Sequence, residues 1–335
     1  MHRIAVDVMG GDRGPGTILD GALDAAREGG VPLTLVGPER DVRGWLAERP
    51  GAAALDLAVV DAAEVIGMGE SPTAALRRRP GASIRVAASE VAAGRAAALF
   101  SAGNTGATVM AAHAAFGRMP GVERPALAAT VPTRGGAAVL LDVGANARCR
   151  PRHLVQFAAM GAAFARLALS IERPRVGLLS IGEEETKGNE LTREVHRLLK
   201  ASGLNFTGNI EARDVYAGGA DVIVCDGFTG NIAIKVSEGL VEMIGGLLRE
   251  VVAGLGPELA ARVGAEVFDI FERRVDDSEY GAVPLLGVAG LALVGHGRSS
   301  AKAVRQGVLA ACRLAEGGFI GRLQQEIAAS GESLP

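Results

Sequence analysis

Four times in this chain an apolar, strand-like run ends in a short loop of Gly, Ser, Asn, Thr and Asp, and a helical pattern follows. The stretches are residues 98–110 (ALFSAGNTGATVM), 138–149 (AVLLDVGANARC), 176–195 (VGLLSIGEEETKGNELTREV) and 222–236 (VIVCDGFTGNIAIKV). Such a loop stands at the C-terminal end of a strand, where open α/β sheets bind ligands. It also opens a helix, whose unpaired N–H groups attract anions. Four similar loops predict one polar, anion-binding cleft.

Strand and helix patterns alternate along almost the whole chain. Continuously apolar strands such as VGLL and VIVC indicate burial on both faces. The βαβα order predicts a Rossmann-like, three-layer α/β fold: a mostly parallel sheet with helices on both faces. The expected strands are residues 4–8, 33–36, 57–60, 97–100, 138–142, 176–180 and 222–225, and the expected helices include residues 17–28, 153–168 and 191–201.

Length and composition limit the possible classes of protein. The 335 residues, 48% of them hydrophobic, show no repeat or low-complexity linker, so residues 1–335 are expected to form a single domain. A net charge of −3 and few aromatic residues argue against a nucleic-acid partner. Three widely spaced cysteines favour a reducing cytoplasm. No uncharged apolar run is long enough for a transmembrane helix, although contact with a membrane surface stays open.

Residues 241–274 differ from the rest, because their pattern is helical with one break at residues 254–257 (GLGP). This pattern predicts a helical hairpin, in which four apolar residues spaced four apart share one face. The apolar stripe is interpreted as packing on the parent sheet or on a second subunit. The alternative is a tip around residues 251–255 that touches lipid. The stripe consists of Leu259, Val263, Val267 and Phe271.

The SAGNTGA loop is the best candidate for an anion cradle. It offers small residues at a helix start, and Asn104 and Thr105 add side-chain donors. It is not a Walker A motif, and the N-terminal GGDRGPG does not match the dinucleotide fingerprint. Ordinary helix capping explains any single loop of this kind equally well.

Single polar residues in the other loops suggest further roles. Lys187 can place a positive charge on a phosphate or carbonyl oxygen, or else be a solvated lysine balanced by neighbouring glutamates. Asn231 supplies an amide, and Asp226 can cap or orient a neighbour. His296 lies between glycines and is either a proton donor or a turn residue.

Several kinds of chemistry are not indicated. The chain has no GxSxG elbow and no HExxH motif. Cys225 has no neighbouring His or Lys in the sequence, so it is interpreted as a small buried residue. Basic clusters at residues 77–79 and at Arg148, Arg150 and Arg152 are interpreted as solvated surface, with an acidic protein partner as the alternative.

The order of the motifs narrows the function. VDVMGGD, SAGNTGA, LDVGAN, IGEEETKGNEL, NFTGNIEARDV, DGFTGN, EYGAVPLLGV and GHGRSSAKAV follow one another along the chain. Together, from about residue 4 to residue 321, they resemble the bacterial acyl-acyl-carrier-protein:phosphate acyltransferase family of phospholipid synthesis. No single motif is diagnostic, but the combination is specific.

The resemblance implies a fold, a reaction and partners. The fold would be similar to the isocitrate/isopropylmalate dehydrogenase and phosphotransacetylase group. The reaction would move a long-chain acyl group from acyl carrier protein to inorganic phosphate, and a membrane glycerol-3-phosphate acyltransferase would use the acyl phosphate. Members are homodimers, cytosolic or peripherally attached to the membrane, and need no nucleotide or metal cofactor.

The resemblance also implies a role for each of the candidate residues. A thioester needs no covalent nucleophile, because its thiol, with a pKa of about 8.5, leaves readily. Lys187 with Asn189 is expected to neutralise phosphate or the oxyanion, Asn231 to hold phosphate, and His296 to protonate the leaving thiolate. LDVGAN, with Asp142 and Asn146, is expected mainly to shape the cleft. The expected phosphate- or substrate-binding residues are Ser101, Gly103, Asn104, Thr105, Gly106, Asp142, Asn146, Asp226, Thr229 and Gly230.

Three rival interpretations remain at this stage. A short-chain phosphotransacetylase would use coenzyme A instead of acyl carrier protein. A dehydrogenase of similar fold would need a nicotinamide site and a metal-binding set of Asp residues, which cannot be assembled from the sequence. A non-catalytic carrier-protein or membrane scaffold is disfavoured by the intact loops that contain Lys187, Asn189 and Asn231.

Overall fold

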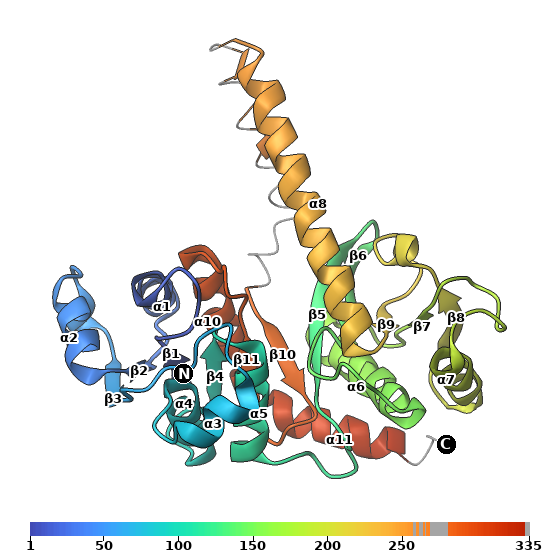
Figure 1. Cartoon of the computed structure of the whole chain (residues 1–335), viewed down its shortest axis with the longest axis horizontal. Coiled ribbons are helices and arrows are strands. Elements are labelled where there is room, and N and C mark those ends of the chain that lie inside the picture. Colours follow the sequence, from blue (N-terminus) through green and yellow to red (C-terminus); the bar gives the residue numbers. More distant parts are fainter. Residues whose placement is uncertain (257–258, 261–263, 265, 269–280, 332–335) are drawn as a thin grey trace.

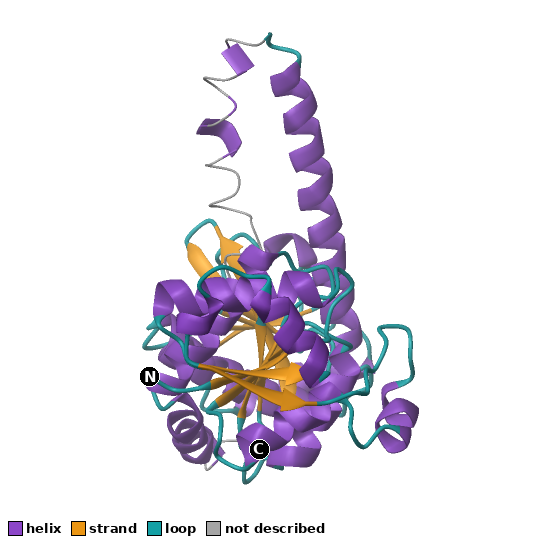
Figure 2. Cartoon of the chain, turned by 90° about the vertical axis from the view of Figure 1, so that its left-hand side faces the viewer, coloured by secondary structure: helices purple, strands orange, loops and turns teal. Residues whose placement is uncertain are grey.

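The computed structural model describes residues 1–256, 259–260, 264, 266–268 and 281–331. Within these residues, eleven strands form one sheet between layers of helices (Figures 1 and 2). The strands are β1 (Ile4–Asp7), β2 (Leu33–Gly37), β3 (Leu57–Asp61), β4 (Ala98–Ser101), β5 (Ala126–Thr133), β6 (Gly136–Leu141), β7 (Val176–Leu179), β8 (Phe206–Ile210), β9 (Val222–Val224), β10 (Val283–Leu286) and β11 (Leu291–Val294). The helices are α1 (Pro15–Gly29), α2 (Glu39–Ala47), α3 (Pro72–Arg78), α4 (Ser83–Ala92), α5 (Thr105–Phe116), α6 (Pro151–Leu169), α7 (Glu190–Ala201), α8 (Gly227–Ala253), α10 (Ala301–Glu316) and α11 (Phe319–Gly331).

The sheet has the order β3-β2-β1-β4-β11-β10-β5-β6-β9-β7-β8. Its first five strands are parallel to one another, and so are its last four. β10 pairs antiparallel with both β11 and β5, and β5 pairs antiparallel with β6. The predicted mostly parallel α/β sheet is therefore confirmed.

The three antiparallel pairings in the middle reverse the direction of the chain. As a result, the parallel strands on the β4 side run opposite to those on the β6 side. The loops after β4 and after β6 therefore do not share one edge of a flat sheet, as the loop pattern alone would suggest. Other contacts must bring them together.

Four strands, β5, β8, β10 and β11, were not among those expected from the sequence. β10 and β11 have only four residues each, and β10 contains Pro284. β8 pairs only with β7, reads FTGNI and contains Gly208 with φ 104°. Short, proline-containing or polar strands give a weak periodic signal, because neighbouring strands rather than local preference hold them.

Two main cores form on the two faces of the sheet. Side chains alternate across the sheet, so Ile4 and Val6 face one core and Ala5 faces the other. The first core is covered by α1, α6, α7, α10 and α11, and the second by α3, α4 and α5. A third, smaller cluster lies under the start of α8 (Figure 1).

Helix α8 stands out from the body of the molecule (Figure 1). It has 27 residues and is about 40 Å long. The sequence predicted a helix from residue 241, whereas the structure begins it at Gly227, because the DGFTGN loop caps the same helix. An ideal Cβ on Gly264 would lie 2.9 Å from Val252 Cγ1, so residue 264 lies against α8. Of the expected hairpin, residues 257–258, 261–263, 265 and 269–274, including Val263 and Phe271 of its stripe, lie outside the described residues.

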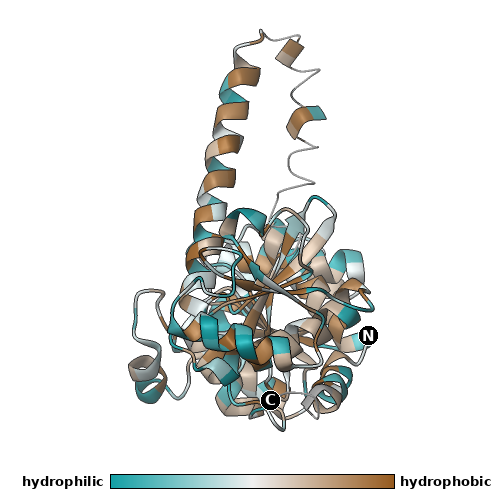
Figure 3. Cartoon of the chain, turned by 90° about the vertical axis from the view of Figure 1, so that its right-hand side faces the viewer, coloured by the Kyte–Doolittle hydropathy of each residue, from teal (hydrophilic) through white to brown (hydrophobic). Residues whose placement is uncertain are grey.

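Apolar residues recur along α8 (Figure 3). Within the described residues, no helix is both long enough and apolar enough to cross a membrane.

The contact between α1 and α10 gives a stability prediction. An ideal Cβ on Gly21 would lie 2.6 Å from Val304 Cβ, whereas one on Gly44 of α2 would meet nothing within 4 Å. Gly21→Ala should therefore lower the free energy of unfolding by about 1–3 kcal/mol through overpacking. Gly44→Ala, the control, should raise it by about 0.4–1 kcal/mol. Urea denaturation of both variants measures the difference, and equal effects would contradict the close helix contact.

Candidate active site

The first group of candidate loops follows β1, β4 and β11. The Ser101 hydroxyl donates to Asp7 Oδ2 at 2.8 Å, and the Gly103 N–H donates to Ser101 Oγ at 3.1 Å. An ideal Cβ on Gly10 would lie 2.6 Å from Gly103 N, so only glycine allows this approach of the two loops. Burial raises the pKa of the Asp7 carboxyl, and the hydroxyls of Ser83 and Ser101 oppose that change.

Asn104 fixes this loop through hydrogen bonds between its side chain and backbone groups of the protein. Its Oδ1 accepts the Ala107 N–H at 3.1 Å and caps α5, as the capping alternative predicts. Its Nδ2 lies within hydrogen-bond distance of three backbone carbonyls. They belong to Gly67 at 3.3 Å, Met68 at 3.0 Å and Glu70 at 3.2 Å. The amide of Asn104 is therefore used inside the protein.

The first N–H groups of α5 remain available. In the described part of the chain, the backbone N–H groups of Thr105 and Gly106 and the Thr105 hydroxyl donate to no acceptor. An ideal Cβ on Gly106 would lie 2.7 Å from Pro72 Cγ, so a larger residue would displace α3 from this position. The N-terminus of α5 can thus offer N–H donors to an anion.

The second group is built around Asp142, whose side chain is fully enclosed. Its Oδ1 accepts N–H bonds from Leu127, Gly144 and Ala145, and its Oδ2 accepts the backbone N–H and the Nδ2 of Asn146. Burial raises the pKa of the Asp142 carboxyl, while these N–H donors oppose the change. The five hydrogen bonds fold the loop into a closed turn.

This turn holds the start of α8. The Gly227 N–H donates to Asn146 O at 2.9 Å, and an ideal Cβ on Gly230 would clash with Asp142 O. Asp226 Oδ1 accepts the Phe228 N–H at 3.0 Å and the Thr229 N–H at 2.9 Å. The Thr229 hydroxyl donates to Asp226 Oδ2 and the Gly230 N–H to Asp226 O. Asp226 therefore caps α8, and the first N–H groups of this helix are not free for phosphate.

Asn231 is free, in contrast. An ideal Cβ on Gly144 would lie 3.7 Å from Asn231 Oδ1, so the amide lies directly beside the Asp142 turn. The side chain is exposed, and it forms no hydrogen bond within the described residues. Its amide N–H groups and oxygen are available to a ligand.

A third group follows β7 and contains Lys187. Asn189 Oδ1 accepts the Thr192 N–H at 2.9 Å and so caps α7. Lys187 is exposed and forms no ion pair with the neighbouring glutamates in the part that the structure describes; Glu185 pairs with Lys200 instead. The Lys187 ammonium is therefore accessible to solvent or to a ligand.

Ser180 is a residue that the sequence analysis did not select. Its hydroxyl oxygen is buried at the end of β7 and has no hydrogen-bond partner in the described structure. An ideal Cβ on Gly188 would lie 2.8 Å from this oxygen, so the Lys187 loop covers it. A serine that directly ends an apolar strand was the only sequence signal for it.

Two connections join the first and second groups. His296 Nε2 lies 3.5 Å from Glu238 Oε2 of α8, and the Gly295 N–H donates to Ser101 O at 2.8 Å. In addition, Val143 and Ala145 pack against the core that contains residues of α5. The structure thus gathers Ser101, Gly103, Asn104, Thr105, Gly106 and His296 on one side and Asp142, Asn146, Asp226, Thr229, Gly230 and Asn231 on the other. Lys187 and Asn189 stand on the third loop, and within the described residues no hydrogen bond or ion pair joins them to either side.

Neither of the two cysteines near these loops, the half-buried Cys149 and the buried Cys225, is suited to be a nucleophile. Burial raises the pKa of the Cys149 thiol to about 12, and the pKa of the Cys225 thiol is also raised by burial. Cys225 is only 3% exposed, as the sequence predicted. No cluster of three or more His, Cys, Asp or Glu able to hold a metal occurs in the described residues.

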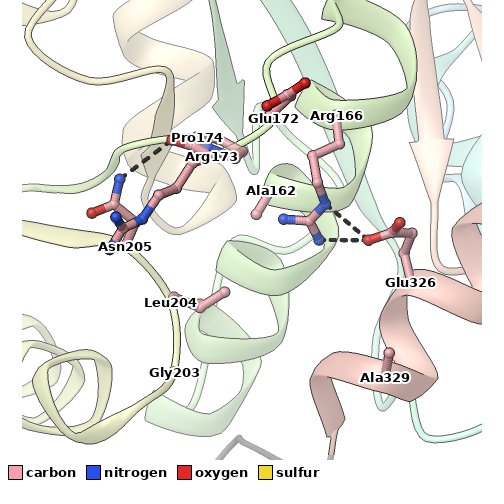
Figure 4. Close-up of a pocket in the computed structure, with 10 residues that line it drawn as sticks. All are labelled: Ala162, Arg166, Glu172, Arg173, Pro174, Gly203, Leu204, Asn205, Glu326 and Ala329. Atoms are coloured by element: carbon pink, nitrogen blue, oxygen red, sulfur yellow. Dashed lines mark hydrogen bonds and ion pairs between the residues drawn. The ribbon is translucent and has the colours of Figure 1, made fainter.

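A cavity of about 340 Å³ lies elsewhere, between α6, α11 and the segments that precede β7 and β8 (Figure 4). Its rim contains the ion pair of Arg166 with Glu326. Because it lies at the N-terminal ends of β7 and β8, it is separate from the loops that follow the strands. None of the predicted site residues lines it.

Solved structures of known enzymes share this fold. A phosphotransacetylase from Streptococcus pyogenes matches with a TM-score of 0.63 and 18% identity, over 95% of this chain and 94% of the other. A 4-hydroxythreonine-4-phosphate dehydrogenase from Klebsiella pneumoniae matches with a TM-score of 0.51 and 15% identity, over 94% of this chain and 100% of the other. These likenesses confirm the predicted fold group.

Sequence relatives are much closer. A family model described as "Fatty acid synthesis protein" matches residues 2–322. A phosphate acyltransferase from Nitratidesulfovibrio vulgaris (strain DP4) is 48% identical over 331 residues, which cover 98% of this chain and 96% of the relative. A phosphate acyltransferase from Geobacter sp. (strain M21) is 45% identical over 334 residues, 99% of this chain and 94% of the relative. The chain therefore belongs to the phosphate acyltransferase family.

Proposed function

We propose that this protein moves a long-chain acyl group from acyl carrier protein to inorganic phosphate and releases acyl phosphate for phospholipid synthesis. The observation that carries the proposal is a set of polar groups that the fold leaves unused. These groups are the N–H groups of Thr105 and Gly106, the amide of Asn231 and the ammonium of Lys187. Each can bind an anion or a developing oxyanion without a metal or a covalent intermediate.

The reaction depends more on the positioning of phosphate and thioester than on the activation of either one. A phosphate oxygen attacks the thioester carbonyl carbon, so a C–O bond forms and the carbonyl oxygen becomes an oxyanion. When the tetrahedral intermediate collapses, the C–S bond breaks and the carrier leaves as a thiolate that takes up one proton. We assign phosphate to the N-terminus of α5 and to Asn231. Lys187, with Asn189 fixing the start of α7, neutralises phosphate or the oxyanion.

His296 is the proposed source of the proton for the thiolate. Its Nδ1 accepts the Arg298 N–H at 3.2 Å, which assigns the proton of a neutral imidazole to Nε2. Nε2 faces Glu238, a carboxylate of α8, at 3.5 Å. Glu238 holds the ring in position. The ring donates as the imidazolium and becomes the neutral imidazole, because the N–H of a neutral imidazole does not protonate a thiolate.

We assign Asp142 and Asn146 an indirect role in the reaction, in which they determine the shape of the cleft. Their polar atoms are satisfied within the protein, so we assign them to fixing Gly144 and the start of α8. Asn231 is held in place by that turn. We give the same supporting role to Ser101, Gly103 and Asp226, whose side chains or backbone N–H groups are already bonded.

Helix α8 supports a homodimer that works at the membrane surface. Its apolar side chains are more than half exposed at intervals of three or four residues, so they form one stripe without a partner in the described chain. Near the tip, Leu255 is 41% exposed. We propose that the stripe pairs with a second copy and that the tip of this cytoplasmic protein touches lipid, where a membrane glycerol-3-phosphate acyltransferase takes the product. The stripe consists of Val236, Leu240, Met243, Leu247 and Val251.

The reaction can be tested directly with purified protein. Palmitoyl-acyl carrier protein and inorganic phosphate should give a product that hydroxylamine traps as the hydroxamate, and omission of phosphate should abolish it. Acetyl-coenzyme A is the competing substrate, because the rival phosphotransacetylase function predicts that it reacts faster. No hydroxamate, or formation independent of phosphate, would refute the proposed reaction.

Within this assay, Lys187→Ala should reduce kcat about 100-fold or more, because one preorganised charge at the oxyanion is lost. The matched control is Lys200→Ala, which removes an exposed lysine that pairs with Glu185. Circular dichroism and thermal unfolding verify that both variants fold. A folded Lys187→Ala variant with wild-type turnover would remove this lysine from the mechanism.

The Asp142 turn predicts a loss of stability. Asp142→Asn replaces one acceptor oxygen by an NH₂ group that faces N–H donors, so the free energy of unfolding should fall by about 1–3 kcal/mol. Asp226→Asn should change it little, since asparagine caps a helix as well as aspartate does. Urea denaturation compares the two variants. A loss no greater for Asp142→Asn than for Asp226→Asn would contradict the proposed role of the turn.

Two substitutions separate the functions of α8. Met243→Glu in the middle of the stripe should convert the dimer to a monomer in sedimentation velocity experiments, because it buries a charge in the apolar contact. Leu255→Glu at the tip should leave the dimer intact and reduce co-flotation with anionic liposomes. Each variant is the control for the other. A dimeric Met243→Glu protein, or unchanged flotation of Leu255→Glu, would contradict the corresponding assignment.

A further inference from the structure

Four arginines form an exposed cluster beside the Asp142 turn. Arg124 lies just before β5, and Arg148, Arg150 and Arg152 lie where the loop after β6 enters α6. All four side chains belong to exposed residues. The sequence alone interprets the last three as solvated surface; Arg124, distant in sequence, joins them only in the fold.

Contacts and charge effects place three of the four near the first turn of α6, and Arg148 stands two residues before Arg150. Arg124 Nη1 donates to Asn146 Oδ1 at 3.5 Å. Arg152 Nε lies 3.2 Å from Glu123 Oε1, and His153 Nε2 lies 3.2 Å from Glu123 Oε2. Burial lowers the pKa of His153, and the nearby charges of Arg124 and Arg150 lower it further. The guanidinium groups therefore surround the first turn of α6.

The cluster carries excess positive charge. Glu123 is the carboxylate that pairs with one of its members, Arg152. Arg124, Arg148 and Arg150 have no carboxylate partner in the part of the chain that the structure describes. Elsewhere exposed arginines are commonly paired, as Arg175 is with Asp221. Unpaired guanidinium groups this close repel one another, so their arrangement favours a negatively charged partner.

The position of the cluster relates it to the reaction. Asn146 bonds to Arg124 through its Oδ1 and to the start of α8 through its carbonyl oxygen. One turn further along α8, Asn231 lies beside Gly144. A partner bound to the arginines is thus next to the amide that we assign to phosphate. This placement suits a partner that delivers a reactive group on a flexible arm.

We propose that Arg124, Arg148, Arg150 and Arg152 form the docking surface for the acidic face of the acyl carrier protein. The proposal rests on the proposed function, because only that reaction requires a protein to bring the thioester. Complementary charge speeds the encounter and orients the carrier. The arm that bears the acyl group then reaches past Asn146 into the cleft.

The test exchanges charge at the cluster and at a matched distant site. Arg148→Glu with Arg150→Glu reverses two charges whose side chains form no hydrogen bond or ion pair with the candidate site in the described structure. Arg40→Glu with Arg313→Glu makes the same change in net charge at exposed positions in α2 and at the end of α10. Each protein is assayed with palmitoyl-acyl carrier protein and with palmitoyl-coenzyme A, and its binding of unacylated carrier protein is measured by calorimetry.

The cluster variant should raise KM for the carrier-protein substrate about tenfold or more, with kcat unchanged. Its binding of unacylated carrier should weaken by the same factor, and its kinetics with palmitoyl-coenzyme A should match the control. The difference should shrink in 1 M salt, where charges are screened beyond about 3 Å. Equal KM values for the two variants would overturn the proposal, as would a loss confined to binding of anionic vesicles.

The two hypotheses fail in different ways. If the wild-type protein forms no acyl phosphate, the proposed function is wrong, whatever the arginines do. If the wild type is active but both variants bind unacylated carrier with wild-type affinity, the reaction stands and the docking surface is wrong. Binding by calorimetry therefore tests the surface independently of turnover.

Discussion

The enclosed carboxylate of Asp142 is the interaction on which the cleft depends. Its hydrogen bonds tie the start of β5, the loop after β6 and Asn146 into one turn. Through Asn146 the same turn fixes Gly227, and with it the position and direction of α8. Every polar residue that α8 contributes, from Asn231 to Glu242, is placed by that single start. A buried charge is tolerated there because five N–H groups replace the water that it has lost.

The reversal of direction in the sheet explains why such a device is needed. Strands that all run the same way bring their C-terminal loops together at one edge without further help. Here the two parallel groups run in opposite directions, so the candidate loops of the two groups are connected by elements that cross between them. Helix α8 is one, since Glu238 and Glu242 pair with His296 and Arg298 of the loop after β11. The second connecting element is the Asp142 turn, whose apolar residues pack against the core that contains residues of α5.

The sequence predicted the fold class and seven of the strands, because each of these has its own apolar run. It could not predict the reversal, since the strands that cause it, β5 and β10, are defined by their partners rather than by local preference. Helix-start motifs had the same limit. Asn104, Asn189 and Asp226 are all chemically able to bind phosphate, yet the structure uses their oxygens as caps. The hydrogen-bond partners in the folded structure decide which of these groups are free and which are occupied. The structure also adds Ser180 and Arg124, whose neighbours come from distant parts of the chain.

The chemistry of the free groups also explains why the site needs no strong base or nucleophile. The thiols of the half-buried Cys149 and the buried Cys225 have raised pKa values, so neither is a ready nucleophile toward the thioester. The groups left free are a lysine ammonium, an amide and two helix N–H groups, which bind anions but do not remove protons at neutral pH. Phosphate needs no deprotonation to attack a thioester whose leaving group is already good. A site whose free groups are mainly fixed donors therefore suits attack by phosphate, which needs no general base, more than attack by water, which does.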